Sequence, residues 1–237
     1  MKKIRRLLLF ILIICLISII GIGLYGYKYY KETVGKVPVT SKILEIREGY
    51  TFIKKEDVPK EYLNAIISVE DHRYYSHGAI DLIGIARAIV TNAKNKQLQE
   101  GGSTITQQVA KNIYFIEEVN VIKRKVAEIF TAIELEKNYS KDEILELYIN
   151  TIYFGDGYYG IKEACNGYLH KEPKDMNLSE ATMMAGIPNA PSVYAPTANK
   201  ELCKKRQAKV ISSMIGNNYI TKEEAEKLDS SFIDNIE

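Results

Sequence analysis

The chain has 237 residues, of which 46% are hydrophobic and 26% are charged, and its formal net charge is +2. These proportions are ordinary for a folded protein with a sizeable core. Lys2, Lys3, Arg5 and Arg6 supply four positive charges, so residues 7–237 sum to −2 (2 − 4). A nucleic-acid-binding domain usually carries its positive excess in the folded part, so this distribution argues against a nucleic-acid partner.

The N-terminal segment is predicted to cross a membrane. Residues 7–25 read LLLFILIICLISIIGIGLY and contain no charge, and a helix of that length spans a hydrocarbon core of ~30 Å. The basic residues before it favour the cytoplasm, so we expect a cytoplasmic tail at 1–6 and a transmembrane anchor at 7–27. A cleaved signal peptide is disfavoured, because the apolar run is long and no small-x-small site follows it. Four tyrosines are predicted to form an aromatic belt: Tyr25, Tyr27, Tyr29 and Tyr30.

The cysteines and histidines do not indicate a metal site. Two cysteines outside the anchor, Cys165 and Cys203, do not make a disulfide framework, and we interpret them as small buried apolar residues. The three histidines are not spaced with the cysteines as metal ligands would be.

The rest of the chain is predicted to be a linker at 28–49, with a short extended stretch at Lys42–Arg47, and one domain at 50–237. From Pro59 onward the apolar spacing is helical and strand signals are sparse, so the fold class is mainly α. Ser140, Ser179 and Thr221 stand where N-caps are expected. The predicted helices are Lys60–Asp71, Ile80–Asn95, Thr104–Ile113, Val121–Asn138, Lys141–Asn150, Gly160–Leu169, Ser179–Gly186, Lys200–Asn217 and Thr221–Leu228.

Glu70 is the first candidate for chemistry. It continues an apolar helical stripe, three residues after Ile67 and four after Ile66. A carboxylate at such a position is partly desolvated, which moves it towards the strength of a general base. The alternative is a glutamate held for structure by Arg73 or His77, and spacing alone leaves both interpretations open.

Glu128 is the second candidate acid. Arg124 and Lys125 precede it by four and three residues, so all three share one helix face. An exposed intrahelical ion pair is the ordinary explanation. Ala132 and Leu135 continue the same stripe, however, which indicates that this face points inward, where the two cations would suit an anionic ligand.

The stretch QEGGSTITQQVAKN at 99–112 concentrates small polar side chains. Gly101 and Gly102 allow the backbone to turn and approach a ligand, and Ser103 or Thr104 is predicted to cap the following helix. A helix start offers free N–H groups and a positive dipole end to phosphate. A solvated surface helix is the default alternative. One polar face of the predicted helix carries Thr104, Gln107, Gln108 and Lys111.

Taken together, these motifs resemble those of the peptidoglycan glycosyltransferases of family 51, the transglycosylase module of penicillin-binding proteins. The resemblance covers residues 50–228, and its strength lies in several motifs in the same order and spacing. They are EDHRYYSHGAID at 70–81, GGSTITQQ with KN at 101–112, RKVAE at 124–128, KDEILELYIN at 141–150, IYFGDGYYGI at 152–161, AGIPNAPSVYAP at 185–196 and RQAKVISSM at 206–214.

The resemblance implies a lysozyme-like, two-lobed helical glycosyltransferase domain at 50–237 behind one transmembrane helix. It implies a bacterial cell-membrane protein with a cytoplasmic N-terminus and an extracytoplasmic catalytic domain. The implied reaction is the polymerisation of lipid II into β-1,4 glycan strands, with inversion and release of undecaprenyl diphosphate. The implied partners are lipid II, the growing lipid-linked glycan chain, the membrane and other cell-wall synthesis proteins, with no nucleic acid and no organic cofactor.

The resemblance also assigns roles to residues. Glu70 matches the general base, and Glu128 matches a second acid associated with a divalent cation, Mg²⁺ or Mn²⁺, and with the diphosphate. Lys111, Arg124 and Lys125 would stabilise the departing charge. The remaining residues of the predicted substrate and diphosphate site are Asp71, His77, Ser103, Thr104, Gln107, Gln108 and Asn112.

Some positions depart from the family's pattern. Ala79 stands where a glycine is usual, and YLHK replaces YFGK at 168–171. The loop IYFIEEVNVI at 113–122 has Glu117 and Glu118 and no cation before Lys123, where many members carry an arginine.

Two rival functions remain, a lysozyme-like glycan-cleaving enzyme and an inactive scaffold that binds lipid II. Since the chain contains no Ser-x-x-Lys, we expect it to be monofunctional and not to bind β-lactams.

Overall fold

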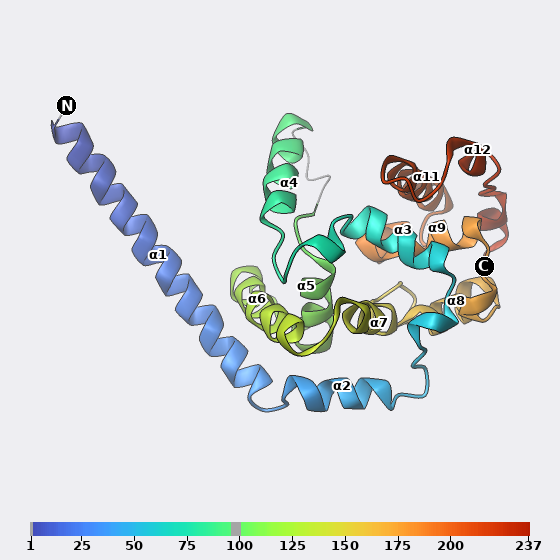
Figure 1. Cartoon of the computed structure of the whole chain (residues 1–237), viewed down its shortest axis with the longest axis horizontal. Helices are drawn as coiled ribbons and strands as arrows, with labels where there is room; N and C mark the ends of the chain where they lie inside the picture. Colours follow the sequence, from blue (N-terminus) through green and yellow to red (C-terminus); the bar gives the residue numbers. More distant parts are fainter. Residues whose placement is uncertain (1, 96–100) are drawn as a thin grey trace.

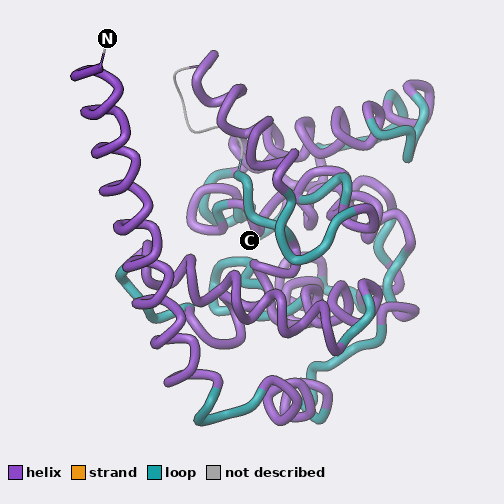
Figure 2. The backbone as a smooth tube through the Cα atoms, turned by 60° about the vertical axis from the view of Figure 1, so that its left-hand side comes forward, coloured by secondary structure: helices purple, strands orange, loops and turns teal. Residues whose placement is uncertain are grey.

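The computed structural model describes residues 2–95 and 101–237, and within them the fold is mainly α, as predicted (Figure 1). Helices follow one another along nearly the whole chain, and the tube in Figure 2 shows helices and loops only. The one β interaction among the described residues is an isolated antiparallel bridge between Tyr153 and Tyr159.

The N-terminal helix α1 (Lys2–Val34) has two different halves. Its first part stands away from the domain (Figures 1 and 2), and its apolar side chains are exposed. Lys3–Val34 is the helix among the described residues that is long and apolar enough to cross a membrane. Residues 28–34 of the predicted linker therefore continue this helix.

The second half of α1 packs against helix α6 (Val121–Asn138). A Cβ at Gly26 would lie 2.3 Å from Cβ of Val126, so only glycine permits this approach. The Tyr30 hydroxyl donates a hydrogen bond to Glu134 at 2.5 Å. Of the four tyrosines of the predicted aromatic belt, Tyr27 and Tyr30 contact Phe130 and Tyr29 contacts Phe115 of the domain, while Tyr25 is exposed. The belt itself stays a prediction.

The predicted extended stretch at Lys42–Arg47 is also wrong. Residues Val39–Arg47 form helix α2. Val39 and Ile43, four residues apart, are both buried, which is the spacing of one helix face. Arg47 Nη2 pairs with Glu143 of α7 (Lys141–Thr151) at 3.1 Å, which fixes the end of α2 to the domain.

The domain contains two groups of packed helices. One group is α3 (Lys60–Glu70), α9 (Leu178–Gly186) and α11 (Lys200–Gly216), and the other is α5 (Ile105–Ala110), α6 and α7. Figure 1 shows the first group beside the C-terminal end and the second nearer to α1. This agrees with a helical domain of two parts, and its likeness to lysozyme stays an expectation.

The other helices are shorter or lie at the edges. Helix α4 (Leu82–Asn95) projects from the body in Figure 1. The remaining elements are α8 (Ile161–Leu169), α10 (Pro191–Tyr194), α12 (Lys222–Ala225), the single turns η1 (Lys55–Asp57), η2 (Tyr74–Ser76), η4 (Pro173–Asp175), η5 (Ile187–Asn189) and η6 (Ser231–Asn235), and a π-helical segment η3 (Lys111–Phe115).

Most of the predicted helix starts are confirmed. Ser140 caps α7 and Thr221 caps α12, each in a capping box with the glutamate three residues later. Ser179 was the wrong choice, because Asn177 caps α9 and accepts a hydrogen bond from the Glu180 N–H. Cys165 and Cys203 are buried and free, as the sequence indicated.

Candidate active site

A groove of about 700 Å³ runs between the two groups of helices. Eight of the predicted site residues line it: Glu70, Ser103, Gln107, Gln108, Lys111, Asn112, Lys125 and Glu128. Four do not belong to its lining: Asp71, His77, Thr104 and Arg124. The opposite wall is made by residues of α11 and of the segment 188–191. Gln99 and Glu100 of the stretch 99–112 lie outside the described residues.

Glu70 is the last residue of α3 and projects into this groove. Ile66 and Ile67 are buried beneath it, so the predicted stripe is confirmed. Arg206 Nη2 donates to Glu70 Oε1 at 3.1 Å, and Gln108 Nε2 donates to Oε2 at 2.9 Å. The side chain is 8% exposed. Neither Arg73 nor His77 holds it, so the alternative partners expected from the sequence are wrong.

Helix α5 brings its polar face to the groove, with one exception. Thr104 is the N-cap: its hydroxyl accepts from the Gln107 N–H at 3.2 Å and donates to the Ala79 carbonyl at 3.0 Å. Thr104 is therefore a buried structural residue. Gln108 and Lys111 line the groove, and among the described carboxylates none pairs with Lys111.

Glu128 is buried at 3% exposure, and its helix face points inward, as predicted. Lys125 Nζ lies 2.9 Å from Glu128 Oε2 and donates to Ser103 Oγ at 2.8 Å. Arg124 Nε lies 3.2 Å from Oε1, at an angle that makes it an ion pair rather than a hydrogen bond. Two cations thus face one carboxylate at the edge of the groove.

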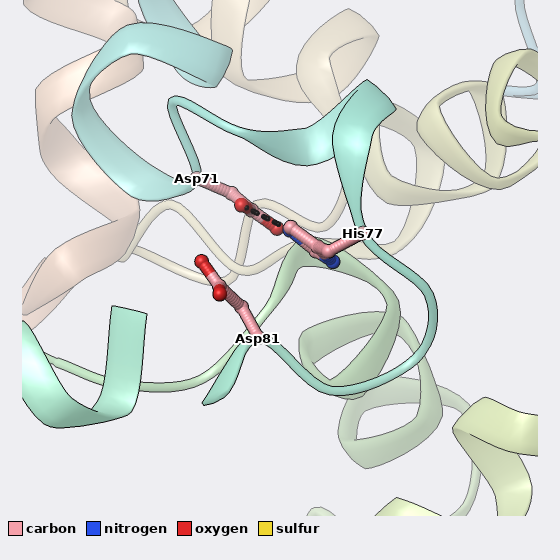
Figure 3. Close-up of side chains that lie close together, drawn as sticks. All are labelled: Asp71, His77 and Asp81. Atoms are coloured by element: carbon pink, nitrogen blue, oxygen red, sulfur yellow. Dashed lines mark hydrogen bonds and ion pairs between the residues drawn. The ribbon is translucent and has the colours of Figure 1, made fainter. Parts of the chain in front are cut away.

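The residues around Glu128 do not fit a divalent cation. Such an ion prefers several oxygen ligands, but both oxygens of Glu128 already face cations. The group of three side chains in the described chain that could hold a metal is elsewhere: Asp71, His77 and Asp81, whose ligand atoms lie within 4.8 Å of one another (Figure 3).

That second cluster is a structural tie. His77 Nε2 lies 2.7 Å from Asp71 Oδ1, the contact drawn in Figure 3, and Asp71 Oδ2 accepts from the Ile105 N–H at 3.1 Å. Asp81 is paired with Arg73 and accepts from the Ile83 N–H at 3.0 Å. Because each carboxylate already has protein donors, including a cation beside Asp81, these side chains hold α3 against the start of α5.

Charges also shape the proton equilibria around this tie. Burial raises the pKa of Asp81, but hydrogen bonds from Arg73 and the Gly84 N–H, with the charges of Arg73 and His77, outweigh it and lower the pKa. At the groove mouth, burial and the nearby guanidinium of Arg87 lower the pKa of His72. His72 is therefore favoured in its neutral form beside the groove.

Sequence reasoning missed Arg206 as a site residue. It belongs to the motif RQAKVISSM, which was recognised without a role. The structure buries Arg206 at 6% exposure, with Nε donating to the Gly186 carbonyl at 3.2 Å and the guanidinium 5.6 Å from the centroid of the Tyr194 ring. A buried arginine needs a carboxylate partner, and that rule could have linked it to Glu70.

Comparisons with known proteins identify the family of the chain. A model of the transglycosylase family matches residues 39–215. Penicillin-binding protein 1A of Neisseria lactamica is 43% identical over 193 residues, covering 78% of this chain and 24% of that protein. Penicillin-binding protein 1F of Bacillus subtilis is 38% identical over 242 aligned positions, covering 95% of this chain and 34% of that protein. The crystal structure of penicillin-binding protein 1A from Haemophilus influenzae aligns with 74% of this chain and 16% of its own, at 23% identity and a TM-score of 0.44.

The helical groove thus brings a glutamate held by protein donors together with nearby cations. The family match covers most of the chain, and the chain belongs to the transglycosylase family. It spans about a quarter to a third of the length of the curated relatives named above.

Proposed function

We propose that this chain polymerises lipid II into β-1,4 glycan strands, with Glu70 as the general base and undecaprenyl diphosphate as the leaving group. The observation that carries the proposal is the position of Glu70. Its carboxylate sits in the groove, which is also lined by Lys111 of η3, Lys125 of α6 and Arg206 of α11. The family match supports the class of reaction, and the finer assignment rests on this geometry.

Glu70 is suited to accept a proton in place. Arg206 and Gln108 each bond one of its oxygens, which fixes the plane of the carboxylate. Each carboxylate oxygen has two lone pairs, so one remains on each for the acceptor's sugar 4-hydroxyl. As the proton moves to Glu70, the hydroxyl oxygen forms a bond to the anomeric carbon of the donor. The bond from that carbon to the diphosphate breaks on the opposite face, which inverts the configuration.

The developing negative charge on the diphosphate needs fixed cations. Lys111 lines the groove without a described carboxylate partner, so its ammonium is available to a ligand. Lys125 is already held by Glu128 and Ser103, which gives it a defined position rather than a mobile one. Donors that are fixed in advance stabilise charge that appears in the transition state, and this is often the largest contribution to catalysis.

A divalent cation takes no part in this proposal. The family implies one, yet Glu128 faces two cations and the Asp71–His77–Asp81 tie is occupied by protein donors. In this chain the basic side chains beside the groove supply the positive charge that the diphosphate requires.

The membrane location fits the proposed substrate. Helix α1 is apolar over a membrane span. A second set of exposed apolar side chains lies on and beside α4, with Leu82 at 75% and Ile89 at 64% exposure. A lipid-linked substrate would stay in the membrane while its headgroup enters the groove. The basic N-terminal residues favour a cytoplasmic N-terminus and an extracytoplasmic domain.

The test is incubation of the purified 237-residue chain with labelled lipid II in liposomes, followed by separation of polymer from monomer. We expect polymer that a β-1,4-specific muramidase digests. A parallel incubation with purified sacculi and no lipid II tests the cleaving alternative. Soluble fragments from sacculi with no polymer from lipid II would overturn the proposal in favour of a lytic enzyme. The absence of both products would also overturn it and would indicate a scaffold.

A further inference from the structure

Glu118 forms a charged node in the loop between η3 and α6. Its Oε2 lies 2.5 Å from Lys123 Nζ, and its Oε1 accepts a hydrogen bond from the Asn120 N–H at 2.8 Å. Asn120 in turn caps α6 by accepting from the Lys123 N–H at 3.0 Å. The Glu118 side chain is only 12% exposed although it lies in a surface loop. The loop is therefore closed on itself by one carboxylate.

The backbone of the same residue holds a cation of the site. The Glu118 carbonyl accepts a hydrogen bond from Arg124 Nη1 at 3.1 Å, while Arg124 Nε faces Glu128 at 3.2 Å. The guanidinium is thus fixed from two sides, by the loop and by the buried acid. A change in the shape of the loop moves the carbonyl and, with it, one of the two supports of Arg124.

The node also touches the membrane helix. Lys123 Nζ lies 4.1 Å from the centroid of the Tyr29 ring, close enough for a cation–π interaction. The Glu118 carboxylate interacts with the Tyr29 hydroxyl. Tyr29 stands three residues after Gly26, at which α1 packs tightly against Val126 of α6. The loop therefore connects the second half of α1 with α6, the helix that carries Arg124.

We propose that Glu118 is a positioning residue that couples α1 to Arg124, an inference that rests on the proposed function because it assigns Arg124 to the diphosphate end of the groove. Glu118 does not touch the substrate. It holds the loop 116–120 so that its own backbone carbonyl keeps Arg124 beside Glu128. Its pairing with Lys123, which contacts the Tyr29 ring, links that arrangement to α1. In this chain the acid Glu118 thus supports Arg124 instead of opposing it.

The adjacent residue supplies a matched control. Glu117 is exposed, whereas Glu118 is bonded on both oxygens. Glu117→Gln and Glu118→Gln therefore make the same change of charge in the same loop. The polymerisation rate is measured on the 237-residue chain with labelled lipid II in liposomes. We expect this rate to fall roughly 5- to 20-fold for Glu118→Gln. The rate of Glu117→Gln should stay within about twofold of wild type.

A double-mutant cycle separates positioning from a merely structural effect. Arg124→Lys keeps the charge but loses the planar guanidinium group, whose nitrogens reach both the Glu118 carbonyl and Glu128. If Glu118 acts through Arg124, adding Glu118→Gln to Arg124→Lys should slow the enzyme by less than about twofold further. Rates that fall by the product of the two single effects would overturn the inference, as would an equal loss in Glu117→Gln.

A charge exchange covers the case in which Glu118→Gln does not fold. The double substitution Glu118→Lys with Lys123→Glu restores the ion pair with its signs reversed, but neither the bond from the Asn120 N–H nor the contact of Lys123 with Tyr29. We therefore expect a polymerisation rate above that of Glu118→Lys alone but below that of wild type. No recovery in a folded protein would contradict the role of the pair.

Amide hydrogen exchange of residues 116–120 gives a readout that does not depend on activity. Exchange should be faster in Glu118→Gln than in Glu117→Gln. If the wild-type chain makes no polymer while this difference is present, the proposed function fails and the closed loop stands. If polymer forms but the effects of the Glu118 and Arg124 substitutions on the rate multiply, Glu118 does not act through Arg124 and the proposed function stands.

Discussion

Glu70 and Asp71 are consecutive acids with opposite surroundings. Glu70 faces the groove, where a guanidinium and an amide hold its two oxygens. Asp71 faces the interior, where His77 and the Ile105 N–H take its oxygens. In the proposed function, Glu70 of this charged motif serves the chemistry, whereas the contacts of Asp71 hold the fold together. What separates the two roles is access to the groove, since both carboxylates are held by protein donors.

The same contrast extends to the cations. Lys111 lines the groove and has no described carboxylate partner, whereas Arg73 is bound to Asp81 within the structural tie. Glu128 combines the two roles, because it borders the groove and is nevertheless buried beneath two cations. Substitutions should therefore divide into those that lower the rate, those that lower stability, and those that do both.

Glu128→Ala should have the largest combined effect. The substitution leaves Arg124 and Lys125 without their shared partner, and breaking a fully buried pair costs ~3–5 kcal/mol. We expect about 2–4 kcal/mol here, because Lys125 keeps 39% of its side chain exposed. The polymerisation rate should fall as well, since both cations lose their fixed positions. Thermal unfolding and the initial rate, measured on the same sample, test both effects. A loss of stability alone, or of rate alone, would contradict the double role of Glu128.

Lys111→Ala should lower the rate with little change in stability. A charge-assisted bond to the diphosphate is worth ~1.5–3 kcal/mol where water is excluded. The rate should then fall roughly ten- to a hundredfold. The melting temperature should move by less than ~2 °C, because Lys111 has no described ion pair to lose. A normal rate would leave the stretch 101–111 as a helix cap only, and Lys94→Ala, an exposed lysine of α4, serves as the control.

Asp71→Asn should give the reverse result. It weakens the contact with His77 and the charge-assisted bond from the Ile105 N–H, at a cost of about 1–3 kcal/mol in the free energy of unfolding. The rate per folded molecule should stay within about threefold of wild type. A tenfold loss of rate at an unchanged melting temperature would show that Asp71 acts on the substrate, as the family resemblance implied.

The smallest expected effect is a pH dependence of stability that comes from Asp81. Its pKa in the folded protein is lowered from 3.8, so its contribution to stability is fully present above pH 3.8 and is lost as the pH falls through the lower folded value. Asp81→Asn should therefore lower the melting temperature by a few degrees near neutral pH, and the gap to wild type should narrow in acid. Melting curves at a series of pH values down to about 3 test this sign. A gap that widens in acid would contradict it.

The sequence predicts the elements better than it predicts the contacts between them. Helices such as α6 and α7 have long apolar periodicity and strong caps, so their bounds are readable from local physics. The stretch Lys42–Arg47 is predicted to be extended, whereas it belongs to helix α2, which packs against α6 and α7, helices distant in the sequence.

The site was predictable where partners lie close in sequence. The pair Arg124–Glu128 follows from i,i+4 spacing on one helix. The partner of Glu70, in contrast, is Arg206, 136 residues away, and periodicity does not reveal such a contact. The neighbouring acid Asp71 was assigned to the substrate because it shares a motif with Glu70, and only the fold shows that it faces the Ile105 N–H.

The most direct test of the account is the initial rate of lipid II polymerisation by Glu70→Gln. Glutamine keeps the shape of the side chain and an acceptor for Arg206, but it cannot take the proton of the acceptor hydroxyl. General-base catalysis contributes about 10²- to 10⁴-fold, so we predict a loss of that size with a circular dichroism spectrum like that of wild type. A folded Glu70→Gln variant that polymerises at a rate near wild type would contradict the assignment of the base.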